Sequence, residues 1–269
     1  MTNRDTNIIV FYLKRHLVVV LALVALIFDP AGVSCQTNIP VVDISADMGN
    51  RYFDAVDYLR KNTWMADTLE LQKIQPAFAL SIVFPGLANY SALRDVMETG
   101  ATRMLYVQSG RRYSHYTVGR FQMKPSFAEQ VERNVSRLKL SSYKFNLTNT
   151  AKARGERARR LDSEEWQLRY LVMFIKIVDK RFKHIKWKTE EDKVRFYATA
   201  FSVGFNRDER TIKRMMTNKS ILRKYKKPKS KYRSGDVAVW FYSNDGYWFD
   251  ARAKQQEIEK ENNEAKISE

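Results

Sequence analysis

Histidine and cysteine, the side chains that most often serve as metal ligands, are scarce in this chain of 269 residues. The sequence has three histidines and one cysteine, namely His16, His115, His184 and Cys35. A structural zinc site takes four such ligands, and His16 belongs to a segment that we expect to be removed. The glycine loops of nucleotide-binding proteins and the nucleophile elbow of hydrolases are also missing from the sequence. The residues therefore indicate no metal site, no cofactor and no triad hydrolysis.

Three segments of the sequence each combine glycine, aromatic and polar residues. They are Phe84-Pro85-Gly86-Leu87-Ala88-Asn89-Tyr90-Ser91, Val118-Gly119-Arg120-Phe121-Gln122-Met123-Lys124-Pro125-Ser126-Phe127 and Tyr197-Ala198-Thr199-Ala200-Phe201-Ser202-Val203-Gly204-Phe205. Together they resemble the lytic transglycosylases of the lysozyme superfamily, over roughly residues 70–242. The resemblance implies a mainly α, lysozyme-like helical domain with a small β or loop element, and it implies binding of peptidoglycan glycan strands.

Glycan cleavage in that family depends on one carboxylic acid at the end of a buried helix. The acid protonates the leaving oxygen and then acts as a base, and burial raises its pKa so that it is protonated near neutrality. Where the resemblance places this glutamate the chain has Gly86, which has no side chain to transfer a proton. Asp95 and Glu98 are the nearest carboxylates, and Glu98 is the fallback acid. We therefore expect impaired catalysis, and the sequence leaves open whether the chain is an enzyme.

The other cleft positions are carried over from the family residue by residue. By resemblance, Gln122 and the backbone around Met123 line the cleft, Ser91 contacts the substrate or the missing acid, and Tyr197 closes the floor under the sugar. Phe201 and Ser202 stand where the family has Tyr and Asn. Part of the family's polar contacts is therefore missing, which is typical of a scaffold retained without catalysis.

The N-terminus has the layout of a secretory signal peptide. Residues 17–28 form an uncharged apolar run, which is shorter than the roughly 20 residues that a membrane-spanning helix needs. We predict cleavage near Cys35, so residues 1–35 are a signal peptide and the mature protein is periplasmic or extracellular. An alternative is lipidation of Cys35, which would tether the protein to a membrane. Simple cleavage is favoured because Gly32 stands where a lipoprotein signal has a branched apolar residue.

Positive charge dominates the composition, with 47 Lys and Arg against 30 Asp and Glu and a net charge of +17. Such a balance predicts a polyanionic partner. Export makes nucleic acid an unlikely partner and favours peptidoglycan or another anionic polymer of the cell envelope. The basic run in residues 151–160 is interpreted as the solvated face of a helix.

Hydrophobic periodicity predicts helices around one core. We expect a helical leader over residues 36–69, the lysozyme-like domain over residues 70–250 and a charged, disordered tail over residues 251–269. Local signals then set the helix ends. Pro76 begins a buried helix that Pro85-Gly86 ends, Ser126 with Glu129 and Asp162 with Glu165 form capping boxes, Thr189 caps a helix that Gly204 stops, and residues 111–123 form a loop or small β element.

Two functions from different classes fit these features. The first is an exported domain that binds, and possibly cleaves, peptidoglycan strands. The second is a non-enzymatic scaffold of the cell envelope whose basic surface, including Lys152 to Arg160, grips an acidic polymer or a protein partner. Nucleic-acid binding through Lys224 to Arg233 is a third, less favoured reading.

Overall fold

The computed structural model describes residues 43–92, 100, 102–114, 116–217, 231–252 and 254–255. The predicted signal peptide, Cys35 and the two carboxylates Asp95 and Glu98 lie outside the described residues. Most of the segment from Lys224 to Arg233 and nearly all of the charged tail also lie outside them. The chain divides into two units, residues 1–42 and 43–269, and the second is described below.

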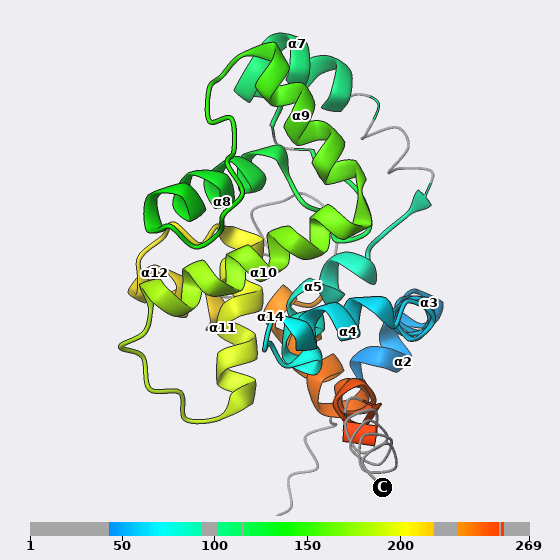
Figure 1. Ribbon diagram of the computed structural model, residues 1–269. Coiled ribbons are helices and arrows are strands. Elements are labelled where there is room, and N and C mark those ends of the chain that lie inside the picture. The colour runs from blue at the N-terminus through cyan, green and yellow to red at the C-terminus, as the bar shows by residue number, and fades with distance from the viewer. Residues whose placement is uncertain are drawn as a thin grey trace, which may run out of the picture. The chain divides into compact units, whose positions relative to one another are not determined.

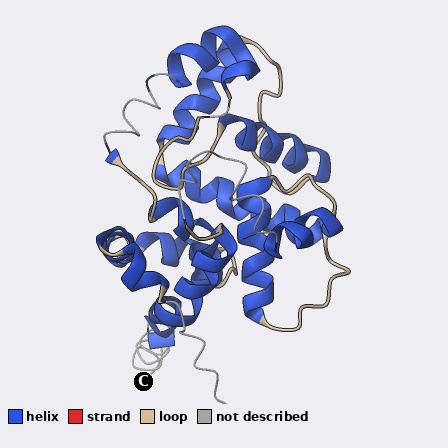
Figure 2. Cartoon of the chain, turned by 180° about the vertical axis from the view of Figure 1, so that it is seen from behind, coloured by secondary structure: helices blue, strands red, loops and turns tan. Residues whose placement is uncertain are grey.

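The described residues form helices joined by loops (Figures 1 and 2), which confirms the mainly α prediction. The α-helices are α2 (Ile44–Met48), α3 (Asn50–Lys61), α4 (Trp64–Leu71), α5 (Pro76–Leu87), α7 (Val107–Ser109), α8 (Pro125–Leu138), α9 (Ala151–Asp162), α10 (Glu164–Arg181), α11 (Glu190–Val203), α12 (Glu209–Thr217) and α14 (Ser234–Phe241). Shorter helices of other types are η1 (Thr102–Tyr106), η2 (Gly110–Tyr113) and η3 (Tyr242–Gly246). Within this described part no strand forms, and the expected β element is a single antiparallel bridge between Val118 and Met123.

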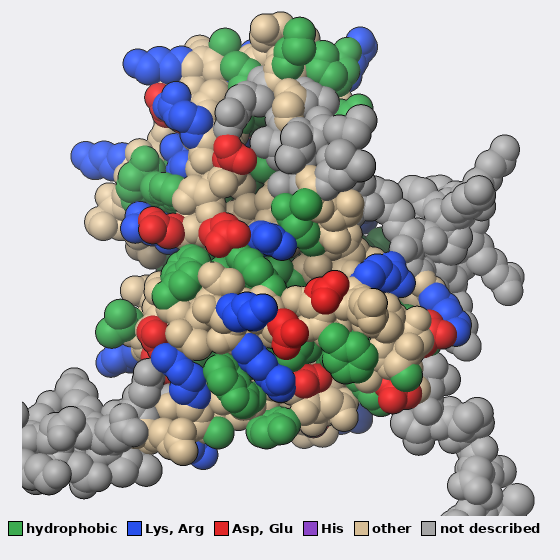
Figure 3. Space-filling model, turned by 90° about the vertical axis from the view of Figure 1, so that its right-hand side faces the viewer, with side chains coloured by type: hydrophobic (Ala, Val, Ile, Leu, Met, Phe, Trp, Pro, Cys, Tyr) green, Lys and Arg blue, Asp and Glu red, His purple; other side chains and the backbone are tan. Residues whose placement is uncertain are grey.

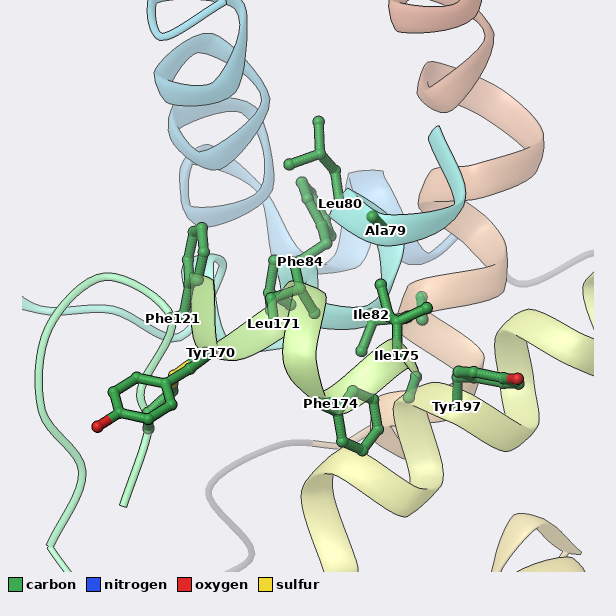
Figure 4. Close-up of a cluster of buried hydrophobic side chains, with 14 of the residues drawn as sticks. Ala79, Leu80, Ile82, Phe84, Phe121, Tyr170, Leu171, Phe174, Ile175 and Tyr197 are labelled. Atoms are coloured by element: carbon green, nitrogen blue, oxygen red, sulfur yellow. The ribbon is translucent and has the colours of Figure 1, made fainter. Parts of the chain in front are cut away.

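Helix α5 is the centre of the core. Almost every residue between Pro76 and Leu87 is buried, and α4, α10, α11 and α14 all contact this helix. The ring of Phe84 stacks on Phe241 with centroids 4.1 Å apart, and Figure 4 shows Phe84 and Ile82 directed into the cluster of buried side chains around Leu171. Because no polar stripe interrupts this helix, α5 can be covered on all sides.

The end of α5 differs from the sequence expectation. The helix runs through Pro85 to Leu87 instead of stopping at Pro85-Gly86. Proline removes one backbone donor but does not force an end when it stands in the last turn, and the side-chain amide of Asn89 donates to the carbonyl of Pro85 at 2.8 Å. Gly86 therefore lies inside the final turn of the helix.

The capping predictions gave mixed results. Thr189 caps α11 by accepting from the backbone N–H of Asp192, and Gly204 ends that helix with a φ of 103°. The two expected capping boxes are wrong. Helix α8 begins at Pro125 with Lys124 as its N-cap, and Ser163, not Asp162, caps α10 by accepting from the N–H of Trp166.

The expectation of a solvated basic helix at residues 151–160 is also wrong. Lys152 and Arg159 are exposed, but Arg154, Arg157 and Arg160 are buried, with 7%, 2% and 7% of their surface accessible. Their spacing of three residues places all three guanidinium groups on one face of α9, and this face packs against α8 and η1.

Two of the buried arginines, Arg157 and Arg160, bind glutamates of α8. Arg157 and Arg160 both contact the carboxylate of Glu132, at 2.6 and 2.9 Å, and Tyr170 of α10 donates to the same carboxylate at 2.6 Å. Arg157 also approaches Glu129, with 3.5 Å between nitrogen and oxygen. Three helices are thus tied together through one buried charged network.

Removing one charge from this network should destabilise the protein strongly. We expect Glu132→Gln to lower the free energy of unfolding by about 3–5 kcal/mol, because two buried arginines lose their shared anion. Urea denaturation measures this loss. The control is Lys231→Gln, which breaks the exposed ion pair with Asp47 and should change stability little. Equal losses in the two variants would contradict a dominant role of the network.

Tyrosines packed in or against the core limit the stability of the fold at alkaline pH. Burial raises the pKa of these tyrosines above their ordinary value of 10.0. They are Tyr52, Tyr106, Tyr170 and Tyr197, which are buried, and Tyr58, which is partly buried.

Above about pH 10 the folded chain therefore holds more protons than the unfolded chain, so its free energy of unfolding falls as the pH rises. We expect cooperative unfolding by circular dichroism to coincide with ionisation of these tyrosines, measured by ultraviolet absorbance. Complete tyrosine ionisation with unchanged helicity would show that the rings are accessible in the folded state.

Candidate functional site

A cavity of about 490 Å³ opens between the end of α5, the turn before α8 and the second half of α11. Residues of all three sequence segments line it. They are Arg51, Ile82, Pro85, Gly86, Asn89, Tyr90, Ser91, Thr117, Phe121, Gln122, Met123, Lys124, Phe127, Ala198, Phe201, Ser202 and Ser234. We call this cavity the Gly86 cleft. Four residues selected from the sequence, Gly86, Ser91, Gln122 and Met123, meet there although they are far apart along the chain.

One wall of the Gly86 cleft is a tight turn between Val118 and Met123. The backbone N–H groups of these two residues donate to each other's carbonyl oxygens at 2.8 and 3.1 Å. Within the turn, Gly119 has a φ of 70° and Gln122 a φ of 52°. The amide of Gln122 accepts from the hydroxyl of Thr117 and donates to the carbonyl of Gly119, so Gln122 stabilises the turn as well as lining the cleft.

The turn approaches α5 so closely that residue 86 has no room for a side chain. A Cβ atom built on Gly86 would lie 2.8 Å from the carbonyl oxygen of Phe121. A glutamate at this position would therefore require the turn to move. The close contact between Gly86 and the Phe121 carbonyl therefore both shapes the cleft wall and excludes an acidic side chain at residue 86.

Gln167 fixes the same turn from the opposite side and was not selected from the sequence. Its side chain is fully buried on α10. The side-chain oxygen accepts from the N–H of Phe121 at 2.8 Å, and the side-chain nitrogen donates to the carbonyl of Leu161 at 2.7 Å. A Cβ atom on Gly119 would overlap this amide. The sequence signal that could have identified Gln167 is its position as a polar residue inside the apolar stripe of α10.

The remaining predicted residues occupy different surroundings. Ser91 is exposed at the cleft edge. Tyr197 is 2% exposed, donates to Asp179 at 2.6 Å and is not among the lining residues. Figure 4 shows Tyr197 on the far side of the cluster from Phe121. Its successors on α11, Phe201 and Ser202, reach the cleft instead.

The charge of the Gly86 cleft is positive. Arg51 and Lys124 are exposed and line it, and among the described residues no aspartate or glutamate does. Nearby, the guanidinium of Arg120 lies over the rings of Tyr58 and Tyr90, at 4.5 and 4.3 Å from their centroids. The described lining can hold a ligand through apolar and cationic contacts, but it supplies no carboxylic acid to protonate a glycosidic oxygen.

No protein-family model, no curated protein and no solved structure matches this chain. In the portion of the chain that the structure describes, no group of three His, Cys, Asp or Glu side chains is placed to hold a metal ion. None of the helices described is both long and apolar enough to span a bilayer.

Two helical glycines provide a matched test of the contact at residue 86. We expect Gly86→Ala to destabilise the protein by about 1–2 kcal/mol, because the overlap with Phe121 outweighs the gain in helix propensity. Gly155 of α9 is the control, since its Cβ would meet only a methyl group of Val107 at an ordinary 3.8 Å.

Gly155→Ala should stabilise the protein by about 0.5–1 kcal/mol. Thermal and urea unfolding of both variants measure the difference. Stabilisation by both alanines would show that the turn does not press on α5.

Proposed function

We propose that this chain is a lysozyme-like domain of the cell envelope that binds peptidoglycan glycan strands in the Gly86 cleft, with impaired or absent cleavage. One observation carries the proposal. Gly86 in the last turn of α5, Ser91 just beyond that helix, Gln122 and Met123 in the turn, and α11 through Phe201 enclose a single cavity. This is the set of segments on which the resemblance to lytic transglycosylases rests.

The lining suits a glycan that carries anionic groups. Phe201 is partly exposed and provides apolar surface for the face of a sugar ring, and the serine and amide side chains at the edge can bond hydroxyl groups. Lys124 and Arg51 add two cations, which would attract the carboxylates of peptidoglycan. The cleft therefore has apolar, polar and cationic groups suited to an anionic glycan, although the acid for cleavage is missing at residue 86.

The alternative of a basic scaffold loses part of its support. Three of the five cations in the run from Lys152 to Arg160 are buried, and two of these three, Arg157 and Arg160, are paired with glutamates. On the face shown in Figure 3, Lys and Arg side chains alternate with Asp and Glu side chains and form no continuous basic surface. A polymer that adheres by charge alone would find fewer contacts than the net charge of +17 suggests.

Export is a separate part of the proposal and rests on residues 1–35. Removal of a signal peptide there would deliver the mature chain to the periplasm or the exterior, where peptidoglycan is found. Lipidation of Cys35 would add a membrane tether without changing the cleft.

Binding to peptidoglycan tests the function directly. We expect the protein to sediment with purified peptidoglycan and to release no fragments with 1,6-anhydro ends, as measured by mass spectrometry. Gln122→Gly should weaken binding about tenfold, because it deletes a lining side chain while tolerating the positive φ. Lys73→Gly is the control, since Lys73 also has a positive φ, 56°, and lies outside the cleft.

The two variants separate the hypotheses. Binding by net charge would weaken when Lys73 is replaced and persist when Gln122 is replaced, which would overturn the cleft assignment. Release of 1,6-anhydro fragments would instead establish a transglycosylase and direct the search for the acid to Glu98.

A further inference from the structure

A second cavity of about 460 Å³ lies between α4, the segment that joins α8 to α9, and α10. It shares no lining residue with the Gly86 cleft. Its lining residues are Thr68, Gln72, Leu140, Ser141, Ser142, Tyr143, Phe145, Trp166, Arg169, Val172, Met173 and Lys176. We call it the Tyr143 cleft. Figure 1 shows α4 beside α10, and the ammonium group of Lys176 donates to the side chain of Gln72 at 2.9 Å.

One stripe of α10 forms the floor of this cleft. Trp166, Arg169, Met173 and Lys176 follow one another at intervals of three or four residues, so they share a face of the helix. Val172 widens this face. Arg169 and Lys176 are seven residues apart, which places their backbones about 10 Å apart along the axis. Two cations therefore flank an apolar floor.

Both cations remain available to an anion. Within the described part of the chain, neither Arg169 nor Lys176 forms an ion pair with a carboxylate. Arg169 is exposed and lies over the ring of Trp166 at 5.0 Å. No aspartate or glutamate is among the described residues that line the cleft. The electrostatic complement of this surface is an extended ligand with two separated negative charges.

The walls favour an apolar side chain over a sugar ring. Tyr143 is 45% exposed and meets Trp166 edge to face at 4.9 Å. The guanidinium groups of Arg160 and Arg169 lie 5.5 and 5.0 Å from the centroid of the Trp166 ring, so a sugar ring stacked on Trp166 would compete with these cations. Val172 and Met173, each 7% exposed, line the floor between the cations, and the exposed ring of Tyr143 adds apolar surface against which a branched or aromatic side chain can be buried.

We propose that the Tyr143 cleft binds an extended acidic peptide segment of a partner protein. Two acidic residues of the segment pair with Arg169 and Lys176, and an apolar residue between them packs on Val172 and Met173. In an extended polyproline II conformation, residues three apart lie on the same side of the chain about 9 Å apart, which is close to the spacing of about 10 Å along the axis of α10 between the backbones of Arg169 and Lys176. This binding is independent of the Gly86 cleft and of any glycan.

Selection from a displayed library of random octapeptides on the full-length protein tests the proposal. We expect enrichment of peptides with two acidic residues three positions apart and an apolar residue between them. A selected peptide, synthesised with a fluorescent label, should bind about tenfold more weakly to the Arg169→Gln/Lys176→Gln double variant. Its amidated counterpart, with Gln and Asn in place of the acids, should lose binding to the original protein.

The control is Lys183→Gln/Lys186→Gln, which removes the same charge from exposed positions outside the cleft and should leave peptide affinity within about twofold. Enrichment of peptides without paired acids, or equal affinity for both double variants, would overturn the proposal. So would displacement of the peptide by a polyuronic acid oligosaccharide, because the cleft would then be an acidic-glycan site. An unchanged melting temperature of the Arg169 and Lys176 variant excludes unfolding as the cause of weaker binding.

Discussion

The contact between Gly86 and the carbonyl of Phe121 is the constraint on which the candidate site depends. It brings the last turn of α5 against the turn of residues 118–123, and the cleft forms where these two elements diverge. Gln167 holds the other side of that turn through the N–H of Phe121. A buried helix, a glycine and a buried amide thus determine the position of Gln122 more than the sequence around Gln122 does.

The charged network of α8, α9 and α10 complements this contact. Helix α8 begins two residues after the turn, at Pro125, and carries Glu129 and Glu132 into the network. The attraction between buried charges offsets their desolvation only when the geometry is good. Glu132 meets this condition, with two guanidinium groups and one phenol around its carboxylate. The turn is therefore followed by a helix that cannot easily rotate or shift.

Local sequence signals predicted where helices begin and end better than they predicted which side chains become buried. Thr189 and Gly204 marked the ends of α11 because a cap and a left-handed stop act within a few residues. The burial of Arg157 could not be read in this way, since its partner Glu132 is 25 residues away on another helix. The ordered motifs located most of the lining of the Gly86 cleft, whereas Gln167 and Arg51 approach the site only through the tertiary fold.

Helix α10 serves both clefts because neighbouring residues on a helix face different directions. Gln167 points to the turn of the Gly86 cleft, and the adjacent Trp166 points into the Tyr143 cleft. Successive residues are about 100° apart around the axis, so one well-packed helix can fix two separate surfaces. Phe174, on the same helix, is fully buried and belongs to the core. Arg169 and Lys176 can therefore be changed without touching the side chains that hold the turn, and the two proposed binding functions can be tested one at a time.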